Sequence, residues 1–143
     1  MDNDPIVLSH ARALLTGASG RTAFIDSDLR DAGKILSQAA ETLDFTQPVA
    51  LMMIAVPHLI PDSDDPWGVV SDYLQALPSG SYLVSSHPAS DVDSGDSEQA
   101  AQRYNERVAS RMRRRSRSEM ARFFDGLEFV EPGIVQLDHW RPQ

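Results

Sequence analysis

Residues 48–56 read PVALMMIAV, and residues 49–56 are the longest unbroken apolar run in a chain of 143 residues. Eight apolar residues after a proline are typical of a strand that is buried on both faces, as in a parallel sheet. The run is less than half as long as a helix that crosses a bilayer, so it does not predict a membrane protein. It predicts the inner part of an α/β fold.

Helix-like and strand-like patterns alternate on both sides of this run. Before it, apolar residues recur at helical spacing over residues 5–15 and 29–43, and a short β-type stretch lies at residues 22–25. The first helix is predicted to end at Gly17 and Gly20. After the run, helical spacing returns at residues 67–77, and a second strand is predicted at residues 81–85. Such alternation indicates a mostly parallel sheet with helices on both faces.

The C-terminal third predicts two helices and a hairpin. One helix is marked by Ala101, Tyr104, Val108 and Met112, and a shorter one at residues 119–124 is predicted to have Ser118 as its cap. Two β-type stretches, 127–130 and 134–137, flank a Pro-Gly pair, which predicts a tight turn. We therefore expect an α/β fold with an antiparallel C-terminal hairpin, in one domain over residues 1–143.

Composition excludes several classes of function. Lys and Arg number 13 against 21 Asp and Glu, a net charge of −8, which disfavours general binding to nucleic acid or to anionic membranes. Without cysteine there is no disulfide, thiolate zinc site or cysteine nucleophile. The acidic turn at residues 62–65 lacks calcium-loop spacing, so we expect no metal site. The N-terminus does not resemble a secretory signal, and we expect a cytoplasmic protein.

Acidic side chains stand where a parallel sheet would bind a ligand, at the carboxyl ends of its strands. Asp2 and Asp4 precede the first helix, and Asp26 and Asp28 follow the stretch at residues 22–25. An aspartate at such a place can accept hydrogen bonds from ribose hydroxyls. The alternative is that Asp4 and Asp28 only cap the helices that follow them. Asp2 has no helix to cap, which favours a ligand role there.

Two histidines follow predicted strands, His58 and His87. A histidine can act as a general base near neutral pH, and His58 is the candidate for such a catalytic role. The alternative for both histidines is a structural role.

Residues 111–117 read RMRRRSR, the one basic patch of the chain, and Arg103, Arg107 and Arg111 are spaced to share a helix face. The patch could contact an anionic partner. With no aromatic interleaving beyond Tyr104, we favour a solvated face that is balanced by acidic neighbours. Those neighbours are Asp91, Asp93, Asp96 and Glu98.

Six segments in order resemble the actinobacterial S-adenosylmethionine-dependent methyltransferase family once catalogued as a domain of unknown function. They read DNDPIVLSHARALL, TAFIDSDLRD, PVALMMIAVPHLIPDSDDP, LPSGSYLVSSH, RSRSEMARFFDGLEFVEPG and WRP. The resemblance implies a Rossmann-like class I methyltransferase sheet with strand order 3-2-1-4-5-7-6 and S-adenosylmethionine as cofactor. It also singles out the pair Arg115-Ser116, and it is weakened around Pro57, where the family usually has a leucine-like residue.

The resemblance implies cofactor-binding roles for five residues. Asp2 would hold the ribose hydroxyls, with Asn3 beside it. Asp28 would accept a hydrogen bond from the adenine amino group, and Leu29 would offer its backbone amide and an apolar wall. Ala55 would lie near the point where the sulfonium and the methyl acceptor meet.

The resemblance further implies a first strand and a Gly-rich turn ahead of the first segment, and residues 1–143 contain neither. We therefore expect the C-terminal part of a methyltransferase domain, inactive by itself, in which the stretch at residues 22–26 lacks its neighbour. The strand at residues 49–56 becomes an open apolar edge prone to self-association. The predicted function is methyl transfer to an acceptor that the sequence does not identify. The alternatives are a non-catalytic interaction module and, more weakly, a nicotinamide-dependent enzyme.

Overall fold

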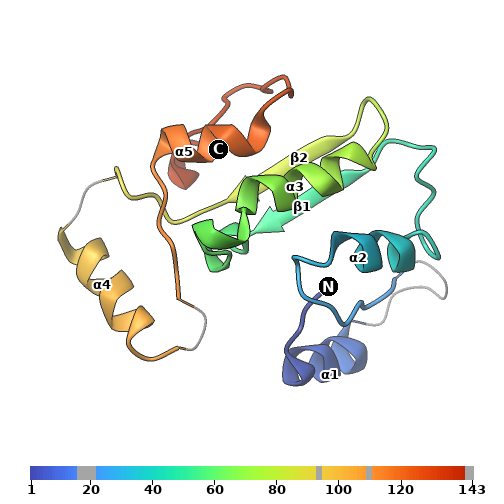
Figure 1. Cartoon of the computed structure of the whole chain (residues 1–143), viewed down its shortest axis with the longest axis horizontal. Coiled ribbons are helices and arrows are strands. Elements are labelled where there is room, and N and C mark those ends of the chain that lie inside the picture. Colours follow the sequence, from blue (N-terminus) through green and yellow to red (C-terminus); the bar gives the residue numbers. More distant parts are fainter. Residues whose placement is uncertain (16–21, 93–94, 109–110, 141–143) are drawn as a thin grey trace. The chain divides into compact units, whose positions relative to one another are not determined.

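A computed structural model describes residues 1–15, 22–92, 95–108 and 111–140 (Figure 1). The chain divides into two compact units. The first comprises Met1–Ala50 and Gly68–Tyr82, and the second comprises Leu51–Trp67 and Leu83–Gln143. Each unit is described by itself, and the single domain over residues 1–143 stays a prediction.

The sheet consists of strands β1 (Ala50–Ile54) and β2 (Tyr82–Ser86), which lie side by side in Figure 1. At one end the Tyr82 amide donates to the Val49 carbonyl at 3.0 Å. At the other end the Ala55 amide donates to the Ser86 carbonyl at 3.3 Å. Because both strands advance together along this ladder, they are parallel. The two strands predicted around residues 49–56 and 81–85 are confirmed, as is their α/β setting.

Strand β1 is covered on one face only. Met53 is 3% exposed, whereas Met52 is 64% and Ile54 is 48% exposed. Successive side chains of a strand point to opposite faces, so Met52 and Ile54 share the open face. The prediction of a strand buried on both faces is therefore wrong for the described chain. Among the described residues β1 pairs with β2 alone. Self-association through an open edge of β1 stays a prediction.

Helix α1 (Pro5–Leu14) begins as predicted. The Asp4 carboxylate accepts from the Ile6 amide at 2.8 Å, and Pro5 occupies the first helical position. Leu8 is the residue of this helix that is buried. The glycines that were predicted to end the helix, Gly17 and Gly20, lie outside the described residues.

The β-type stretch at residues 22–25 is reduced to one parallel bridge between Asp2 and Asp26. The Asp2 amide donates to the Ile25 carbonyl, and the Ser27 amide donates to the Asp2 carbonyl, both at 3.1 Å. The prediction that this stretch lacks a neighbour is wrong, because the backbone at Asp2 pairs with it. The pairing is short because only one residue contributes on the Asp2 side.

Helices α2 (Ala32–Ala39) and α3 (Pro66–Gln75) follow the predicted apolar periodicity. Helix α2 is shorter than the predicted residues 29–43, because Asp31 caps its start through the Lys34 amide at 3.1 Å and turns follow Ala39. In helix α3, Tyr73 is buried.

Helices α4 (Gly95–Asn105) and α5 (Arg117–Ala121) differ from their predicted bounds. Helix α4 stops at Asn105, whose side chain bonds both backbone groups of Met112, so Arg103, Arg107 and Arg111 do not share a helix face. Helix α5 is capped by Ser116 rather than Ser118. Ser116 forms a reciprocal capping box with Glu119, which lies three residues further on.

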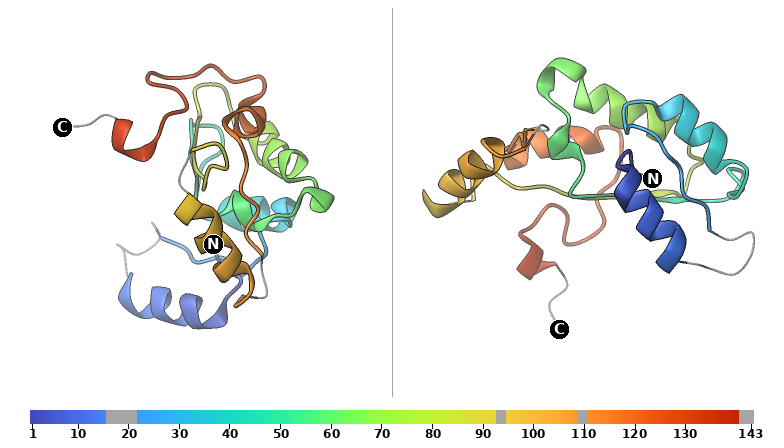
Figure 2. Two further views of the ribbon diagram at one scale, coloured as in Figure 1. Left: turned by 90° about the vertical axis from the view of Figure 1, so that its left-hand side faces the viewer. Right: turned by 90° about the horizontal axis from the view of Figure 1, so that it is seen from below.

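The C-terminal hairpin prediction is wrong for the described residues. The turn is present, with the Gly133 amide donating to the Val130 carbonyl at 2.8 Å, but residues 127–130 and 134–136 form no strands. A short 3-10 turn follows at Leu137–His139, drawn in red in Figure 2. A hairpin without a third strand is marginal in water, and the apolar side chains of Phe129, Val130 and Leu137 are exposed. Within the described residues, no helix is long and apolar enough to cross a bilayer.

Candidate functional site

Four of the predicted cofactor-binding residues come together in the first unit. The bridge between Asp2 and Asp26 sets the two segments side by side, although they lie about 25 residues apart in the sequence. The Asn3 side-chain amide donates to Asp28 Oδ2 at 3.4 Å, and Leu29 follows Asp28 directly. The backbone bridge therefore gathers Asp2, Asn3, Asp28 and Leu29, which we call the acidic cluster.

Arg30 fixes the carboxylate of Asp28. Its side chain donates from Nε to Oδ1 at 2.9 Å and from Nη2 to Oδ2 at 2.8 Å, and its backbone amide donates to Oδ1 at 2.9 Å. The side-chain hydrogen bonds from Arg30 are the largest cause of a lowered pKa of Asp28, which is about 2. Asp31 caps helix α2, so the alternative that Asp28 only caps this helix is wrong. Asp28 is an ionised acceptor, and its side chain is 37% exposed.

Asp2 and Leu29 keep polar groups that the fold does not use. Asp2 accepts from the Asp4 amide through Oδ1 at 2.9 Å, and no described donor reaches Oδ2. The Leu29 carbonyl accepts from the Tyr73 hydroxyl at 2.7 Å, while the Leu29 amide donates to no acceptor in the described part of the chain. One carboxylate oxygen and one amide are thus available to a ligand.

Tyr73 and Arg30 are residues of this site that the sequence analysis missed. Burial, and then the nearby carboxylates of Asp31, Asp28 and Asp72, raise the pKa of Tyr73 to about 12. Its hydroxyl therefore stays protonated and donates to the Leu29 carbonyl. The sequence shows Tyr73 only as one apolar position of a helix.

The fifth predicted cofactor residue, Ala55, lies in the second unit and follows β1 directly. Its φ of +52° is in the left-handed region, which a residue with a Cβ adopts at a cost of about 1 kcal/mol. Its amide donates to the Ser86 hydroxyl at 2.9 Å and to the Ser86 carbonyl at 3.3 Å. Strained backbone of this kind is common at ligand sites, although it does not identify a ligand.

His58 and His87, which follow β1 and β2 in the second unit, pack edge to face with ring centroids 5.8 Å apart. His58 is 8% exposed. Burial lowers the pKa of both imidazoles, and the positive charge of Arg115 lowers both further, that of His87 to about 4. Both rings are therefore neutral at pH 7.

Arg115 is a fully buried cation, with 0% of its surface exposed. Nη1 donates to the Pro57 carbonyl at 3.0 Å, and Nη2 donates to the Ile60 carbonyl at 2.8 Å and to Asp62 Oδ1 at 2.7 Å. The rings of Trp67 and Phe123 lie 5.5 and 5.7 Å from the guanidinium carbon. These hydrogen bonds anchor Arg115 to the segment that follows β1, at Pro57, Ile60 and Asp62.

The prediction of a solvated basic face is wrong for Arg115, which is buried, whereas Arg111, Arg113 and Arg117 are exposed. Arg113 pairs with Asp62 at 3.0 Å and with Glu119 at 3.2 Å, and Arg114 donates to the Ala89 carbonyl. Of the expected acidic partners, Asp91 accepts from the Arg117 backbone amide at 2.8 Å. Asp93 and the side chains of Asp96 and Glu98 lie outside the described residues. The pair Arg115-Ser116, which the resemblance singled out, has two local roles. Arg115 is a buried anchor, and Ser116 caps helix α5.

Four polar atoms beside Arg115 are buried with no hydrogen-bond partner among the described residues. They are His58 Nδ1, His87 Nδ1, His87 Nε2 and Arg115 Nε. A buried polar atom without a partner costs a folded protein about 1–3 kcal/mol, and a group of them needs an explanation. We call His58, His87 and Arg115 the imidazole cluster.

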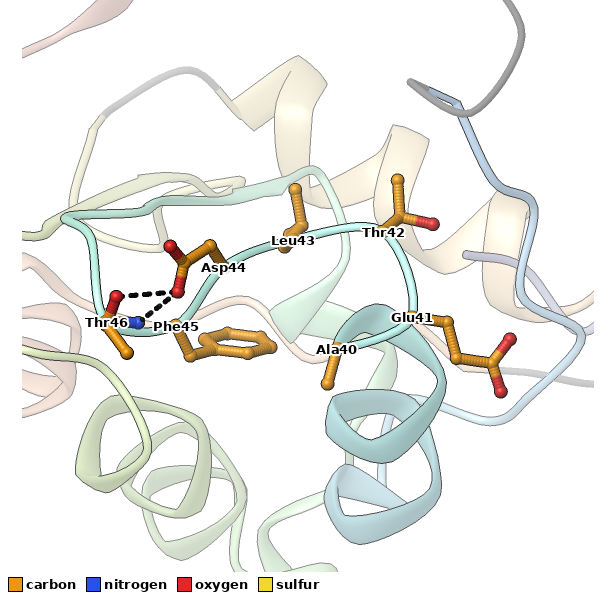
Figure 3. Close-up of a pocket in the computed structure, with 7 residues that line it drawn as sticks. All are labelled: Ala40, Glu41, Thr42, Leu43, Asp44, Phe45 and Thr46. Carbon is orange, nitrogen blue, oxygen red and sulfur yellow. Dashed lines mark hydrogen bonds between the residues drawn. The ribbon is translucent and has the colours of Figure 1, made fainter.

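Two surface hollows lie elsewhere and contain none of the predicted site residues. The first is formed by the loop Ala40–Thr46, drawn in Figure 3, where the Asp44 carboxylate already accepts from the amide and hydroxyl of Thr46 at 2.9 and 2.7 Å. The second lies in the second unit, between Asp91, helix α5 and the turn at Pro132. No group of three or more potential metal ligands occurs in the part of the chain that is described.

Comparison with known proteins identifies relatives of this chain. A family model described as S-adenosyl methyltransferase matches residues 1–143. A solved structure of a DUF574 family protein from Streptomyces avermitilis is 43% identical, with a TM-score of 0.92, and the match covers 99% of this chain and 55% of that one. A protein assigned provisionally as a methyltransferase, from Thermobifida fusca, is 34% identical, with a TM-score of 0.87 and coverage of 99% and 52%. The chain thus spans about half the length of these two structures. No curated protein matches it.

Proposed function

The chain belongs to the S-adenosyl methyltransferase family, and we propose that it contributes to a site for S-adenosylmethionine-dependent methyl transfer. The acidic cluster binds the adenosine part of the cofactor. Because the chain spans about half of its solved relatives, the activity and the acceptor of the whole protein are part of this proposal.

The observation that carries the proposal is the pairing of an ionised acceptor with an unused donor at Asp28 and Leu29. Asp28 accepts from the adenine amino group, and the adjacent Leu29 amide donates to a ring nitrogen. Asn3, whose bond to Asp28 is the longest of the four at that carboxylate, is the donor that the amino group most easily displaces. The Arg30 contacts keep the carboxylate ionised and fixed in orientation.

The ribose is held by Asp2. Its Oδ1 is committed to the Asp4 amide, and its Oδ2 accepts from a ribose hydroxyl. Carboxylates at the ends of parallel strands perform this task in other dinucleotide and nucleoside sites. Ala55, at the end of β1, stays a predicted cofactor contact. The cofactor, when bound, supplies an electrophilic methyl group, and the chain supplies binding and orientation.

Calorimetric titration of the full chain with S-adenosylhomocysteine tests the proposal. We expect a dissociation constant of about 100 μM or tighter, equivalent to about −5.5 kcal/mol. Asp28→Asn removes the charge that accepts from the amino group and should weaken binding about tenfold. Asp2→Asn, which keeps an oxygen for the Asp4 amide, should weaken binding by a smaller factor.

Asp26→Asn is the matched control. Asp26 lies on the same segment and is exposed, and the described contacts at this residue are made by its backbone. Binding should be unchanged in this variant. No heat at millimolar ligand, or an equal loss in Asp26→Asn and Asp28→Asn, would contradict the proposed role of the acidic cluster.

A further inference from the structure

The hydroxyl of Tyr73, on helix α3, is bound to the turn that carries Asp28. Tyr73 is 3% exposed, and its hydroxyl donates to the Leu29 carbonyl at 2.7 Å, although the two residues lie 44 positions apart in the sequence. Both residues belong to the first unit. Packing alone does not account for the hydroxyl, because a phenylalanine would bury the same ring without needing a hydrogen-bond partner.

The peptide group between Leu29 and Arg30 connects this hydroxyl to the Asp28 carboxylate. The carbonyl of the peptide group accepts from Tyr73 at 2.7 Å, and its N–H, which belongs to Arg30, donates to Asp28 Oδ1 at 2.9 Å. Hydrogen bonds at the two ends of one peptide group polarise each other, so the bond at the carbonyl makes the N–H a stronger donor. We call the hydroxyl, this peptide group and the carboxylate the Tyr73 network.

The Tyr73 network complements the grip of the Arg30 side chain on the same carboxylate. The Arg30 side chain is 52% exposed, and a long exposed side chain loses conformational freedom when it is held in one geometry. Tyr73 is buried in the packed interior and is already fixed. The orientation of Asp28 therefore depends on a buried group as well as on an exposed one.

The electrostatics of the site keep the hydroxyl in the form that the network needs. The pKa of Tyr73 is raised to about 12, first by burial and then by the carboxylates of Asp31, Asp28 and Asp72. The hydroxyl is therefore protonated at neutral pH. A tyrosinate would have no proton to donate to the Leu29 carbonyl.

We propose that Tyr73 is a positioning residue, whose hydroxyl acts through the Leu29–Arg30 peptide group to fix the Asp28 carboxylate in the orientation that accepts from the adenine amino group. The control of Asp28 by Tyr73 stands on the hydrogen bonds, whereas its use in adenine recognition rests on the proposed function. Tyr73 acts through Asp28 and does not contact the ligand. A carboxylate that is fixed before binding loses less freedom on binding, which favours affinity.

The Arg30 amide signal in NMR spectra of the full chain tests the network without a ligand. Tyr73→Phe keeps the buried ring and removes the hydroxyl. Tyr82→Phe is the matched control, since Tyr82 is 60% exposed and no described residue bonds its hydroxyl. The Thr46 amide, which donates to the Asp44 carboxylate at 2.9 Å, is an internal control of the same kind.

We expect Tyr73→Phe to move the Arg30 amide proton upfield, because a weaker hydrogen bond deshields it less, and to leave the Thr46 amide unchanged. Tyr82→Phe should move neither signal. Incorporation of fluorotyrosine, whose hydroxyl is a stronger donor, should move the Arg30 signal downfield. An Arg30 signal that stays in place in both the phenylalanine variant and the fluorinated chain would overturn the network.

The preference between two nucleosides tests the use of the network in recognition. Purine riboside lacks the amino group of adenosine and keeps its ring nitrogens and ribose. We expect the wild type to bind adenosine about tenfold more tightly than purine riboside, and Tyr73→Phe to reduce this ratio to about threefold. A merely structural role would weaken both nucleosides equally, so an unchanged ratio in Tyr73→Phe would overturn the positioning role.

The two measurements separate this inference from the proposed function. If the Arg30 signal responds but the wild type binds neither nucleoside, the network exists, and adenosine binding by the acidic cluster is rejected together with the role of Tyr73 in it. If the wild type prefers adenosine and Tyr73→Phe keeps the full preference, the proposed function stands and the role of Tyr73 is wrong.

Discussion

The two units of the chain differ in where they place a key charged side chain, at the surface in the first unit and in the interior in the second. In the first, the Asp28 carboxylate lies at the surface, where four hydrogen bonds from Arg30 and Asn3 satisfy it. In the second, the Arg115 guanidinium is entirely buried, and the polar atoms beside it are unpaired. An exposed, ionised group can recognise a ligand by charge, whereas a buried cation disfavours further positive charge around it. The difference predicts that recognition by charge takes place in the first unit.

The largest expected effect comes from removing the buried cation. Arg115→Met leaves the Pro57 and Ile60 carbonyls and one Asp62 oxygen without their donors. We expect the free energy of unfolding to fall by about 3 kcal/mol. The matched exposed variant, Arg30→Met, should cost about 1 kcal/mol or less. Urea unfolding measures both, and equal losses would remove the contrast between the two units.

The stability contributions of titrating groups in the two units should be lost in different pH ranges. The lowered pKa of His58 and His87 means that the folded state binds fewer protons than the unfolded state below about pH 6.5. The contribution of His87 is complete above the unfolded pKa of 6.5 and is lost as the pH falls towards 4, and that of His58 has the same sign. Asp28, with a pKa of about 2 against 3.8, contributes fully above 3.8 and loses its contribution towards pH 2.

After burial, the charge of Arg115 lowers both pKa values, and His58 lowers that of His87 further. A backbone hydrogen bond with Arg113 and, to a smaller extent, the charge of Glu119 raise the pKa of His87. Urea midpoints across this pH range measure the effect. His87→Leu should flatten the curve between pH 6.5 and 4 and leave it unchanged below that window. A curve that stays equally steep in the variant would show that another group titrates there.

His87→Leu should also stabilise the chain at neutral pH, because it replaces two unpaired buried nitrogens by apolar surface. We expect a gain of about 1 kcal/mol, or roughly 2–4 °C in the melting temperature. His10→Leu on the exposed side of α1 should change the melting temperature little. Calorimetry gives both values, and a loss of stability in His87→Leu would mean that the His87 nitrogens are satisfied in the folded chain.

The smallest expected effect concerns the cap that follows the buried arginine. Ser116→Ala removes the hydroxyl that accepts from the Glu119 amide and should cost about 1 kcal/mol. Ser118→Ala, the variant that the sequence prediction would have favoured, should cost less than half of that. Urea unfolding of the two variants decides between the two serines.

Local patterns predicted local features well. The apolar run at residues 49–56 identified β1, and Asp4 followed by Pro5 identified the start of α1. The predicted hairpin was wrong because an isolated pair of strands is marginally stable without a third strand beside it. A local sequence pattern does not show whether such a strand is present. The burial of Arg115 was missed because its partners lie 53–58 residues away in the sequence. The ion pair between Arg30 and Asp28 was also missed, although the two residues are only two positions apart in the sequence.

The most direct test of the division between the units is a titration with S-adenosylmethionine on three chains, the wild type, Asp28→Asn and His87→Leu. The account predicts that the wild type and His87→Leu bind with the same affinity, and that Asp28→Asn binds about tenfold more weakly. No binding by the wild type, or equal losses in the two variants, would contradict it.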